Sequence, residues 1–340
     1  MTRYWNLLLS ILCVGLLVAL AVSLARTISG ESNVIRIAHD SKENSPLHQA
    51  MLRFKEEVEA QSQGVMRVEI YPSRQLGDVK ETTELVRQGN VHMTVGASVL
   101  LTSVVPEFNV LDLFYLFRDT GHAHRALDSE QVGGVLLEAM SSKGFHGIGF
   151  MEVGFRSITS NARPVVEFED IAGLKIRAAS NPTQIAAWKA VDAAPTPLSW
   201  SEIFTSLEQG LIDSQESAIY SIYAERFFEA QHYLSFTDHI YTNYVWFSNQ
   251  QYWDGLDQQS KDIIQRAAVV AIEYQRQLAD SQNNEIIGQL VQHGMQVNTV
   301  SQPVRNRIKQ AMNGAVRDEL RQRTGPELFD RVMSAIERQE

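Results

Sequence analysis

The sequence predicts an α/β protein with two domains. Its 340 residues are more than one hydrophobic core usually organises. Near the start, a β-branched segment, a segment with helical spacing and an alternating segment follow one another, and this strand–helix–strand order is typical of α/β domains. Near the end, residues 257–293 contain only one helix breaker, Gly288, so they predict one very long helix or two with a kink. A helix of that length is able to lie across both domains.

The first predicted unit is a strand, a helix and a second strand. Residues 34–38 are rich in β-branched side chains, and residues 66–71 alternate between apolar and polar side chains, so both predict strands. Between them, Ser45-Pro46 is a helix-start signal, and residues 47–61 carry apolar side chains at helical spacing. Gly64 ends the pattern.

The second unit repeats this order and leads into a longer series of elements. Residues 78–88 predict a helix that ends at Gly89-Asn90, and residues 91–96 predict a strand. Residues 108–117 are strongly apolar and predict a strand or loop buried beneath a cleft. The other expected elements are a helix at 119–143, strands at 147–153 and 173–177, helices at 182–191, 200–209 and 218–230, a strand at 241–248, and helices at 304–323 and 326–339.

The N-terminal segment predicts export. Residues 4–25 contain no charged side chain and are mostly Leu, Val, Ile or Ala, with Arg3 before them and Arg26 after them. A basic start, an apolar middle and the small-residue exit Ser23-Leu24-Ala25 are typical of a signal peptide, so we expect cleavage after residue 25. The apolar run is also long enough for an uncleaved membrane anchor. Either reading predicts that the remaining chain is periplasmic.

Composition and motifs exclude several classes of function. The net charge is −10 and the estimated pI is 5.4, which argues against nucleic acid as a partner. The sequence has neither a Gly-x-Ser-x-Gly elbow nor a Gly-x-Gly-x-x-Gly segment after a strand. The nine histidines form no metal-ligand pattern, and the single cysteine, Cys13, lies in the N-terminal segment. We therefore expect no cofactor and no metal.

Two arginines form the strongest candidate binding site. Arg156 in Gly-Phe-Arg and Arg177 in Gly-Leu-Lys-Ile-Arg lie at the predicted ends of short strands. A guanidinium binds a carboxylate through two parallel charge-assisted hydrogen bonds, so the pair predicts a site for an organic acid. The alternatives are a surface salt bridge for Arg177 and a structural role in a loop for Arg156.

Several short motifs, in their order and spacing, are specific together although each is weak alone. They are Ser62-Gln63-Gly64, Tyr71-Pro72-Ser73, Gln75-Leu76-Gly77-Asp78, the Gly-x-Arg segment at Arg156, Gly173-Leu174-Lys175-Ile176-Arg177, Pro195-Thr196-Pro197-Leu198 and Asp213-Ser214-Gln215-Glu216. With these motifs, the chain from about residue 35 to the C-terminus resembles the extracytoplasmic solute-binding proteins of TRAP transporters, of the C4-dicarboxylate type.

The resemblance implies roles for individual residues. Arg177 would bind the ligand carboxylate, Arg156 would add a second contact, and Trp200 would close over the ligand, although on composition alone a core position is the alternative for Trp200. Ser217 stands where the family usually has an asparagine, and it would reach the ligand through a water. The other candidate ligand-binding residues are Glu216 and Gln75, and Glu81 is a further candidate for the near wall.

The resemblance also implies the architecture. The expected fold is a two-lobed α/β periplasmic binding protein with a mixed sheet in each lobe, an interlobe cleft and a long helix that spans both lobes. We expect lobe I to comprise residues 31–154 plus 243–282, and lobe II to comprise residues 155–242 plus 283–340. Residues 1–25 form the signal peptide or anchor.

The implied function is capture of a small organic acid and its delivery to the TRAP permease by closure of the cleft. Succinate, malate or fumarate fits two arginines, and so does a sugar acid such as a hexuronate. One alternative is a membrane-tethered ligand-sensing protein. The other is a periplasmic enzyme acting on a carboxylated substrate, with Glu216 as the only nearby acid or base.

Overall fold

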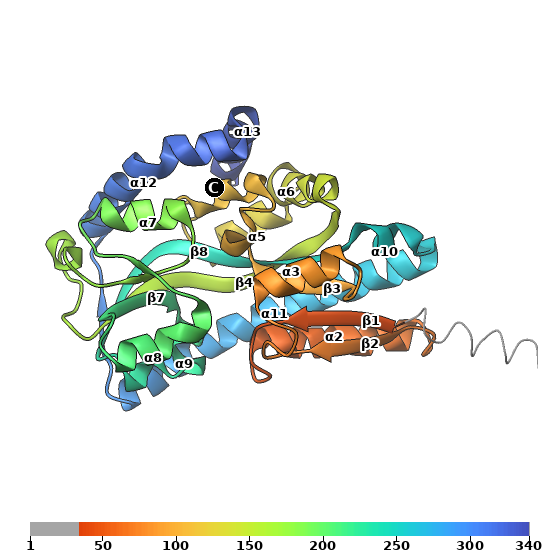
Figure 1. The fold of residues 1–340 in the computed structure, drawn as a ribbon, viewed down its shortest axis with the longest axis horizontal. Helices are drawn as coiled ribbons and strands as arrows, with labels where there is room; N and C mark the ends of the chain where they lie inside the picture. Colours follow the sequence, from red (N-terminus) through yellow and green to blue (C-terminus); the bar gives the residue numbers. More distant parts are fainter. Residues whose placement is uncertain (1–33, 340) are drawn as a thin grey trace, which may run out of the picture.

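The computed structural model describes residues 34–339 and arranges them as a mixed β-sheet flanked by helices (Figure 1). The sheet has seven strands in the order β2-β1-β3-β8-β4-β7, with β9 (Gln296–Thr299) paired to β8. β1 (Val34–His39) pairs in parallel with β2 (Arg67–Tyr71) and β3 (Met93–Ala97), whereas β8 runs antiparallel to β3 and β4. The α/β class with a mixed sheet is thus confirmed.

Two long strands, β4 (Phe145–Ser160) and β8 (Tyr233–Asn249), run side by side through the middle of the molecule (Figure 1). β3 pairs with residues 244–248 of β8, at one end, and β7 (Ser214–Ala218) pairs with residues 156–160 of β4, at the other. The two halves of the sheet are therefore joined through β4 and β8.

The sequence predicted only parts of these two strands. β4 continues beyond Gly154, which has φ +111° and lies at one of three register shifts between β4 and β8. A glycine at a β-bulge resembles a strand end in sequence but continues the strand in space. The expectation that Arg156 ends a short strand is wrong for this reason, because Arg156 lies inside β4.

The first predicted unit is confirmed in detail. α2 (Pro46–Gln61) begins after Ser45, whose hydroxyl accepts the backbone N–H of His48 at 3.0 Å. α3 (Val79–Arg87) begins with a capping box in which Asp78 and Glu81 each accept a backbone N–H at the helix start. Such caps satisfy the free N–H groups of a first helical turn, and they are local enough to be recognised from sequence.

The long helix is continuous. α11 (Gln258–Gln292) has 35 residues and is capped by Asp257, which accepts the backbone N–H of Ser260. In its first half, Ile263 and Ile264 pack in a core with α2, and in its second half Leu290 packs in another core with α8 (Ile203–Glu208) and α9 (Ile219–Ala224). α11 therefore runs from the side of α2 to the side of α9 (Figure 1).

Several predicted elements differ from the structure. Of the strand expected at 173–177, only Arg177 is in a strand, and it begins that strand instead of ending it. The helix expected at 218–230 is the shorter α9, followed by a 3₁₀ turn at Phe227–Glu229. Residues 108–117 form neither a strand nor a simple loop, because Pro106–Asp112 is a 3₁₀ helix with a buried segment after it. The helix expected at 119–143 is interrupted at Ser129, whose hydroxyl accepts the N–H of Val132, so that α5 (Thr120–Asp128) and α6 (Val135–Ala139) are separate. Serine competes with the backbone for such bonds and favours helix ends.

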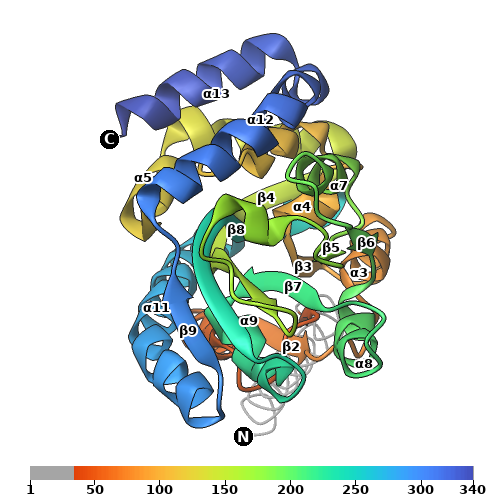
Figure 2. The same ribbon diagram turned by 90° about the vertical axis from the view of Figure 1, so that its left-hand side faces the viewer.

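The remaining elements complete the two sides of the sheet. They are α4 (Ser98–Leu101), β5 (Arg177–Ala178), α7 (Pro182–Lys189), β6 (Thr196–Pro197), α10 (Gln250–Gly255), α12 (Gln302–Thr324) and α13 (Pro326–Arg338). β5 and β6 form a separate two-stranded sheet, and α12 and α13 lie together along one side of the molecule (Figure 2). No helix within residues 34–339 is both long and apolar enough to cross a membrane. The predicted signal peptide lies outside these residues.

Candidate functional site

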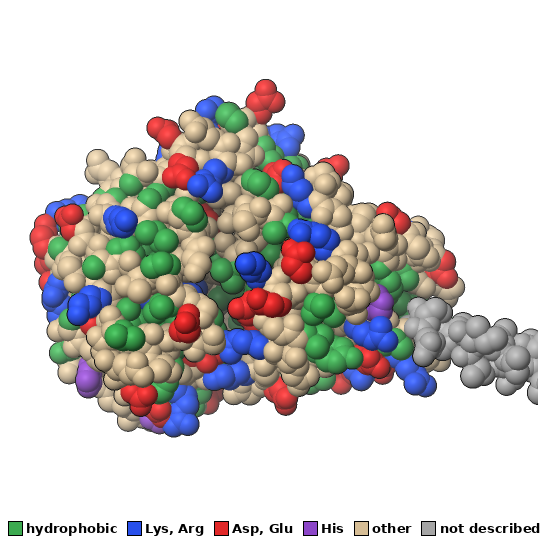
Figure 3. All heavy atoms as spheres, in the orientation of Figure 1, with side chains coloured by type: hydrophobic (Ala, Val, Ile, Leu, Met, Phe, Trp, Pro, Cys, Tyr) green, Lys and Arg blue, Asp and Glu red, His purple; other side chains and the backbone are tan. Residues whose placement is uncertain are grey.

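A cavity of about 790 Å³ is enclosed by two walls that come from different parts of the chain. One wall comes from the segment after β1, from α3 and from α4, and the other comes from β5, the segment at 198–200 and α9. Figure 3 shows a hollow near the centre of this face, bordered by acidic and basic side chains. Four of the six candidate ligand-binding residues line the cavity: Arg156, Arg177, Trp200 and Glu216.

Arg177 is a buried cation at the wall of this cavity. Its side chain is only 5% exposed, and its Nε and Nη2 donate to the carbonyl oxygen of Leu198 at 3.2 and 2.9 Å. The guanidinium lies 5.5 Å from the ring centre of Trp200. No side-chain carboxylate of residues 34–339 forms an ion pair with it, and burial lowers the pKa of Arg177 to about 10. The surface salt bridge considered for Arg177 is therefore wrong.

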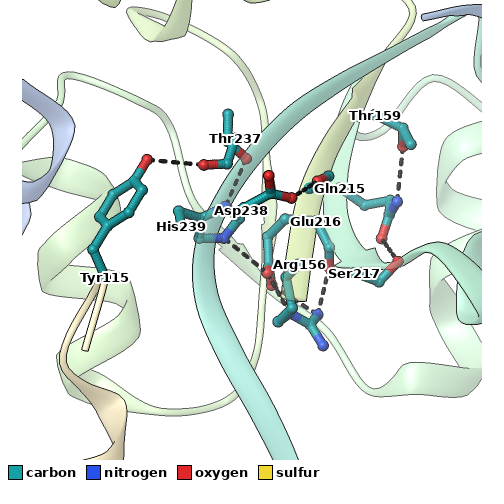
Figure 4. Close-up of polar contacts among 10 residues, drawn as sticks. Tyr115, Arg156, Thr159, Gln215, Glu216, Ser217, Thr237, Asp238 and His239 are labelled. Carbon is teal, nitrogen blue, oxygen red and sulfur yellow. Dashed lines mark hydrogen bonds and ion pairs between the residues drawn. The ribbon is translucent and has the colours of Figure 1, made fainter. Parts of the chain in front are cut away.

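Arg156 is held by a buried carboxylate. Its Nη2 donates to Glu216 Oε1 at 2.9 Å and also to the backbone oxygen of Glu216, while its Nε donates to Oε2 (Figure 4). The imidazole Nε2 of His239 lies 3.2 Å from the same Oε2. The three residues come from β4, β7 and β8, so the pairing of these strands positions them.

The ion pair leaves one positive charge at this end of the cavity. Burial alone would raise the pKa of Glu216, but Arg156 and His239 hold it at about 2, so this carboxylate is ionised at neutral pH. It neutralises Arg156, and Arg177 is left without a counterion in the described chain. The arrangement suits one ligand carboxylate placed against Arg177.

Trp200 lies on the opposite wall from the segment after β1. It is half-buried, and its Nε1 donates to Glu225 Oε1 at 3.2 Å while its ring packs edge-on against Phe227. This anchoring fixes the indole next to the Arg177 guanidinium.

Two candidate residues lie outside the cavity lining. Ser217 is fully buried, and its hydroxyl donates to Gln215 Oε1 at 2.9 Å, away from Glu216 (Figure 4). Successive residues of a strand face opposite sides of a sheet, so Glu216 and Ser217 of β7 cannot both face the cavity. Gln75 is exposed, and its neighbour Arg74 lines the cavity instead. Glu81 does lie along the wall, where it also caps α3.

Sequence reasoning missed two carboxyl groups that line the cavity, those of the buried Asp112 and the half-buried Asp40. Burial raises the pKa of Asp112 to about 7, and Asp112 Oδ2 accepts a hydrogen bond from Asn181 Nδ2 at 2.9 Å. Burial also raises the pKa of Asp40 to about 6, against the opposing effect of Arg74. One signal was available for Asp112, because it is the only charged side chain in the apolar run 108–117.

Contacts across one side of the cavity join the two walls. Lys42 Nζ donates to the backbone oxygen of Ala224 at 2.5 Å and lies 3.1 Å from Glu225 Oε2. Arg74 Nη2 lies 3.8 Å from Glu225 Oε1. We call Lys42, Arg74 and Glu225 the bridging triad, because it links the β1 and α3 side to the α9 side.

The part of the chain that the structure describes contains no group of three or more His, Cys, Asp or Glu side chains able to hold a metal ion. The cavity lining combines charged, hydroxyl and amide side chains from both walls. It is suited to binding a small polar anion between two walls.

Comparison with known proteins gives a consistent result. Residues 37–322 match the family described as bacterial extracellular solute-binding protein, family 7. The chain is 31% identical over 284 residues to the 2,3-diketo-L-gulonate-binding periplasmic protein YiaO of Escherichia coli, covering 84% of this chain and 86% of that one. It is 28% identical over 319 residues to the C4-dicarboxylate-binding periplasmic protein DctP of Rhodobacter capsulatus, covering 93% and 95%.

A solved structure supports the same fold. A TRAP periplasmic solute-binding protein from Ochrobactrum anthropi superposes with a TM-score of 0.84 at 31% identity, covering 90% of this chain and 95% of that one.

Proposed function

The chain belongs to family 7 of the bacterial extracellular solute-binding proteins, and on this premise we propose that its ligand is a polyhydroxylated monocarboxylic acid. As a solute-binding protein of a TRAP transporter, it captures a small organic acid outside the cytoplasm and delivers it to the membrane subunits of the permease. The observation that carries the finer proposal is the charge balance of the cavity, in which a single buried cation, Arg177, lacks a carboxylate partner among residues 34–339.

The rest of the cavity supports one carboxylate rather than two. Its other cations are either paired or exposed at the rim: Lys42, Arg74, Lys80, Arg156 and Arg323. Acidic side chains line much of the remaining wall: Asp40, Asp78, Glu81, Glu84 and Asp112. A second ligand carboxylate would meet these groups and be repelled or left unpaired, which costs several kcal/mol, roughly 3–5 for a buried unpaired charge.

The hydroxyl groups of a polyhydroxylated ligand would find hydrogen-bond partners on this acidic wall. Near neutral pH, Asp112, with a pKa raised to about 7, is present both as a protonated group that donates a hydrogen bond and as a carboxylate that accepts one. Asp40, with a pKa of about 6, is mostly ionised there and accepts hydrogen bonds from hydroxyl groups. Tyr220 and the Asn181 amide also line the cavity. A volume of about 790 Å³ leaves room for an extended, hydrated chain. YiaO, which is named for a sugar acid, lends independent support.

The proposed mechanism is closure of two lobes around the acid. The lobes are residues 31–154 plus 243–282 and residues 155–242 plus 283–340, connected by β4, β8 and α11. The carboxylate pairs with Arg177, and Trp200 covers it. Binding favours the closed state because the ligand contacts both walls, and exclusion of water strengthens the ion pair.

A ligand screen tests the proposed class. In a thermal-shift measurement, aldonates and uronates should raise the melting temperature at concentrations where succinate, malate and fumarate have little effect, because ligand binding stabilises by mass action. Calorimetry should then give the affinity of the best acid. A larger shift with succinate than with any sugar acid would reject the polyhydroxylated class and favour a dicarboxylate.

The bridging triad should contribute modestly to affinity. Glu225→Gln removes the ion pairs with Lys42 and Arg74 but keeps an oxygen for Trp200. Because Lys42 is about two-fifths exposed, these pairs contribute roughly 0–1 kcal/mol, so affinity should fall less than about tenfold. Calorimetry at low and high salt checks this, with Glu208→Gln at an exposed position of α8 as the control. A hundredfold loss would mean that Glu225 contacts the ligand directly.

We extend the proposal to the location of the protein and to the role of Glu216. We propose that residues 1–25 direct export, either as a cleaved signal peptide or as an anchor, and mass measurement of the mature N-terminus distinguishes the two. The family consists of transport proteins, so the coarse function is binding rather than catalysis. The ion pair with Arg156 keeps Glu216 ionised and bound, which argues against Glu216 as a general acid.

A further inference from the structure

A second cavity, of about 440 Å³, lies apart from the candidate ligand site. It is formed by the segment that leads into α5, by the start of α5, by single residues of β4 and β8 and by the first turns of α12. α5 and the start of α12 lie side by side in Figure 2. The cavity lining includes three cations and three aromatic rings: Arg118, Arg305, Lys309, Tyr115, Phe117 and Phe155.

The lining is locally positive in an acidic protein. Three cations, Arg118, Arg305 and Lys309, face two carboxylates, Asp119 and Asp238. Both carboxylates are already engaged. Asp119 Oδ1 accepts the backbone N–H of His122 at 2.7 Å to cap α5, and Asp238 Oδ2 lies 2.9 Å from Arg305 Nη2.

Two of the cations have no counterion. Within residues 34–339, neither Arg118 nor Lys309 forms an ion pair, although both are exposed and the chain as a whole carries a charge of −10. Because the lining holds three cations and two carboxylates, its net charge is one positive charge, which a monoanion would balance. A local positive field persists in an acidic protein because nearby charges dominate at short range.

The guanidinium of Arg305, the third cation, is held by hydrogen bonds before any ligand binds. Arg305 Nε donates to the carbonyl oxygen of Val300 at 3.0 Å, and its Nη2 donates to the carbonyl oxygen of Phe236 at 2.7 Å. In the described chain its Nη1 has no hydrogen-bond partner, and its side chain is 18% exposed. A rigid guanidinium with a free N–H group costs little entropy when an anion binds.

Aromatic rings supply the apolar part of the cavity. The Tyr115 hydroxyl donates to the carbonyl oxygen of Thr237 at 3.1 Å, and the Tyr115 backbone N–H donates to the carbonyl oxygen of His239 at 2.8 Å, so this residue is anchored on β8. Phe117 and Phe155 both pack edge-on against Tyr241. Phe117 is buried, whereas the half-buried rings of Tyr115 and Phe155 are held in place by their neighbours and offer surface against which a flat molecule packs.

We propose that this second cavity is a binding site for a small planar monoanion, of the aromatic carboxylate class. The carboxylate lies between Arg118, Lys309 and the free Nη1 of Arg305, and the ring packs against Tyr115 and Phe155. The site is separate from the organic-acid site, because the adjacent residues Phe155 and Arg156 of β4 line different cavities. It does not depend on the proposed sugar-acid specificity.

The test uses 4-fluorobenzoate as the probe, observed by fluorine NMR on the full exported chain carrying Arg177→Ala. This change removes the cation of the organic-acid cavity, so that failure of the second site is distinguishable from failure of the first. The probe should still bind to Arg177→Ala, and acetate, which lacks the ring, should bind at least severalfold more weakly. No binding of 4-fluorobenzoate, or equal binding of acetate, would overturn the proposal.

Charge reversal then locates the site. Adding Arg118→Glu and Lys309→Glu should raise the dissociation constant of the probe at least about tenfold. The control pair, Arg67→Glu and Lys189→Glu, makes the same charge change at exposed positions on β2 and α7 and should leave it within about twofold. An equal loss of affinity for the probe in both double variants would show that only the net charge of the protein matters, and it would overturn the proposal. Should the glutamate pair fail to fold, Arg118→Ala with Lys309→Ala provides the same comparison.

Discussion

Replacing Arg177 by alanine should abolish binding of the organic acid. Arg177 is buried at the cavity wall, and in the described chain it has no carboxylate partner, so a bound carboxylate would be its counterion. Without it, the ligand carboxylate enters a water-excluding cavity unpaired, which costs roughly 3–5 kcal/mol. The affinity should therefore fall roughly a hundred- to several-thousand-fold. Calorimetry with the best acid of the screen measures this loss.

Two further variants separate charge from geometry. Arg177→Lys keeps a positive charge but loses the planar pair of donors, so its affinity should lie between those of the wild type and Arg177→Ala. Lys175→Ala removes an exposed cation two residues earlier in the chain and should leave the affinity unchanged. The melting temperature without ligand should change little in Arg177→Ala, because burial disfavours this cation in the empty protein. Unchanged ligand affinity in Arg177→Ala would remove this residue from the binding site.

Glu216→Gln should strongly destabilise the empty protein. The change leaves the Arg156 guanidinium, which is 12% exposed, without its counterion. Breaking a buried ion pair from one side costs roughly 3–5 kcal/mol, so the free energy of unfolding at pH 7 should fall by about that amount. Urea denaturation measures it, and Glu208→Gln on the surface of α8 is the matched control. A loss below about 1 kcal/mol would show that the pair contributes no more than a surface salt bridge.

The pH dependence of this difference has a definite sign. The pKa of Glu216 is about 2 in the folded protein, against an ordinary value of 4.5, so the ionised form favours folding. Its contribution is fully present above a pH of about 4.5 and is lost as the pH falls toward about 2. The stability difference between the wild type and Glu216→Gln should therefore shrink over that range. The ligand should also stabilise Glu216→Gln more than the wild type, because its carboxylate compensates the additional positive charge.

Sequence reasoning predicted the parts of the fold that depend on interactions between residues close together in the chain, and it missed parts that depend on distant partners. Ser45, Asp78 and Asp257 cap their helices through bonds to residues two or three positions away, and these helix starts were predicted within about one residue. α11 was recognised because its sequence contains a single glycine and no proline. β7 was missed, although all of its residues are buried, because the sequence Ser-Gln-Glu-Ser-Ala carries no strand pattern.

By itself, the sequence determined the α/β class, the long helix, the family and the presence of Arg156 and Arg177, because helix caps, hydrophobic spacing and ordered motifs are local properties of the chain. Only the tertiary structure decided which charges remain free. β7 brings Glu216 against Arg156 and turns Ser217 away. The packing of distant segments buries Asp112 and partly buries Asp40 at the same cavity. The physical reason is that the net charge and hydrogen-bonding capacity of a site depend on burial and on partners far apart in sequence.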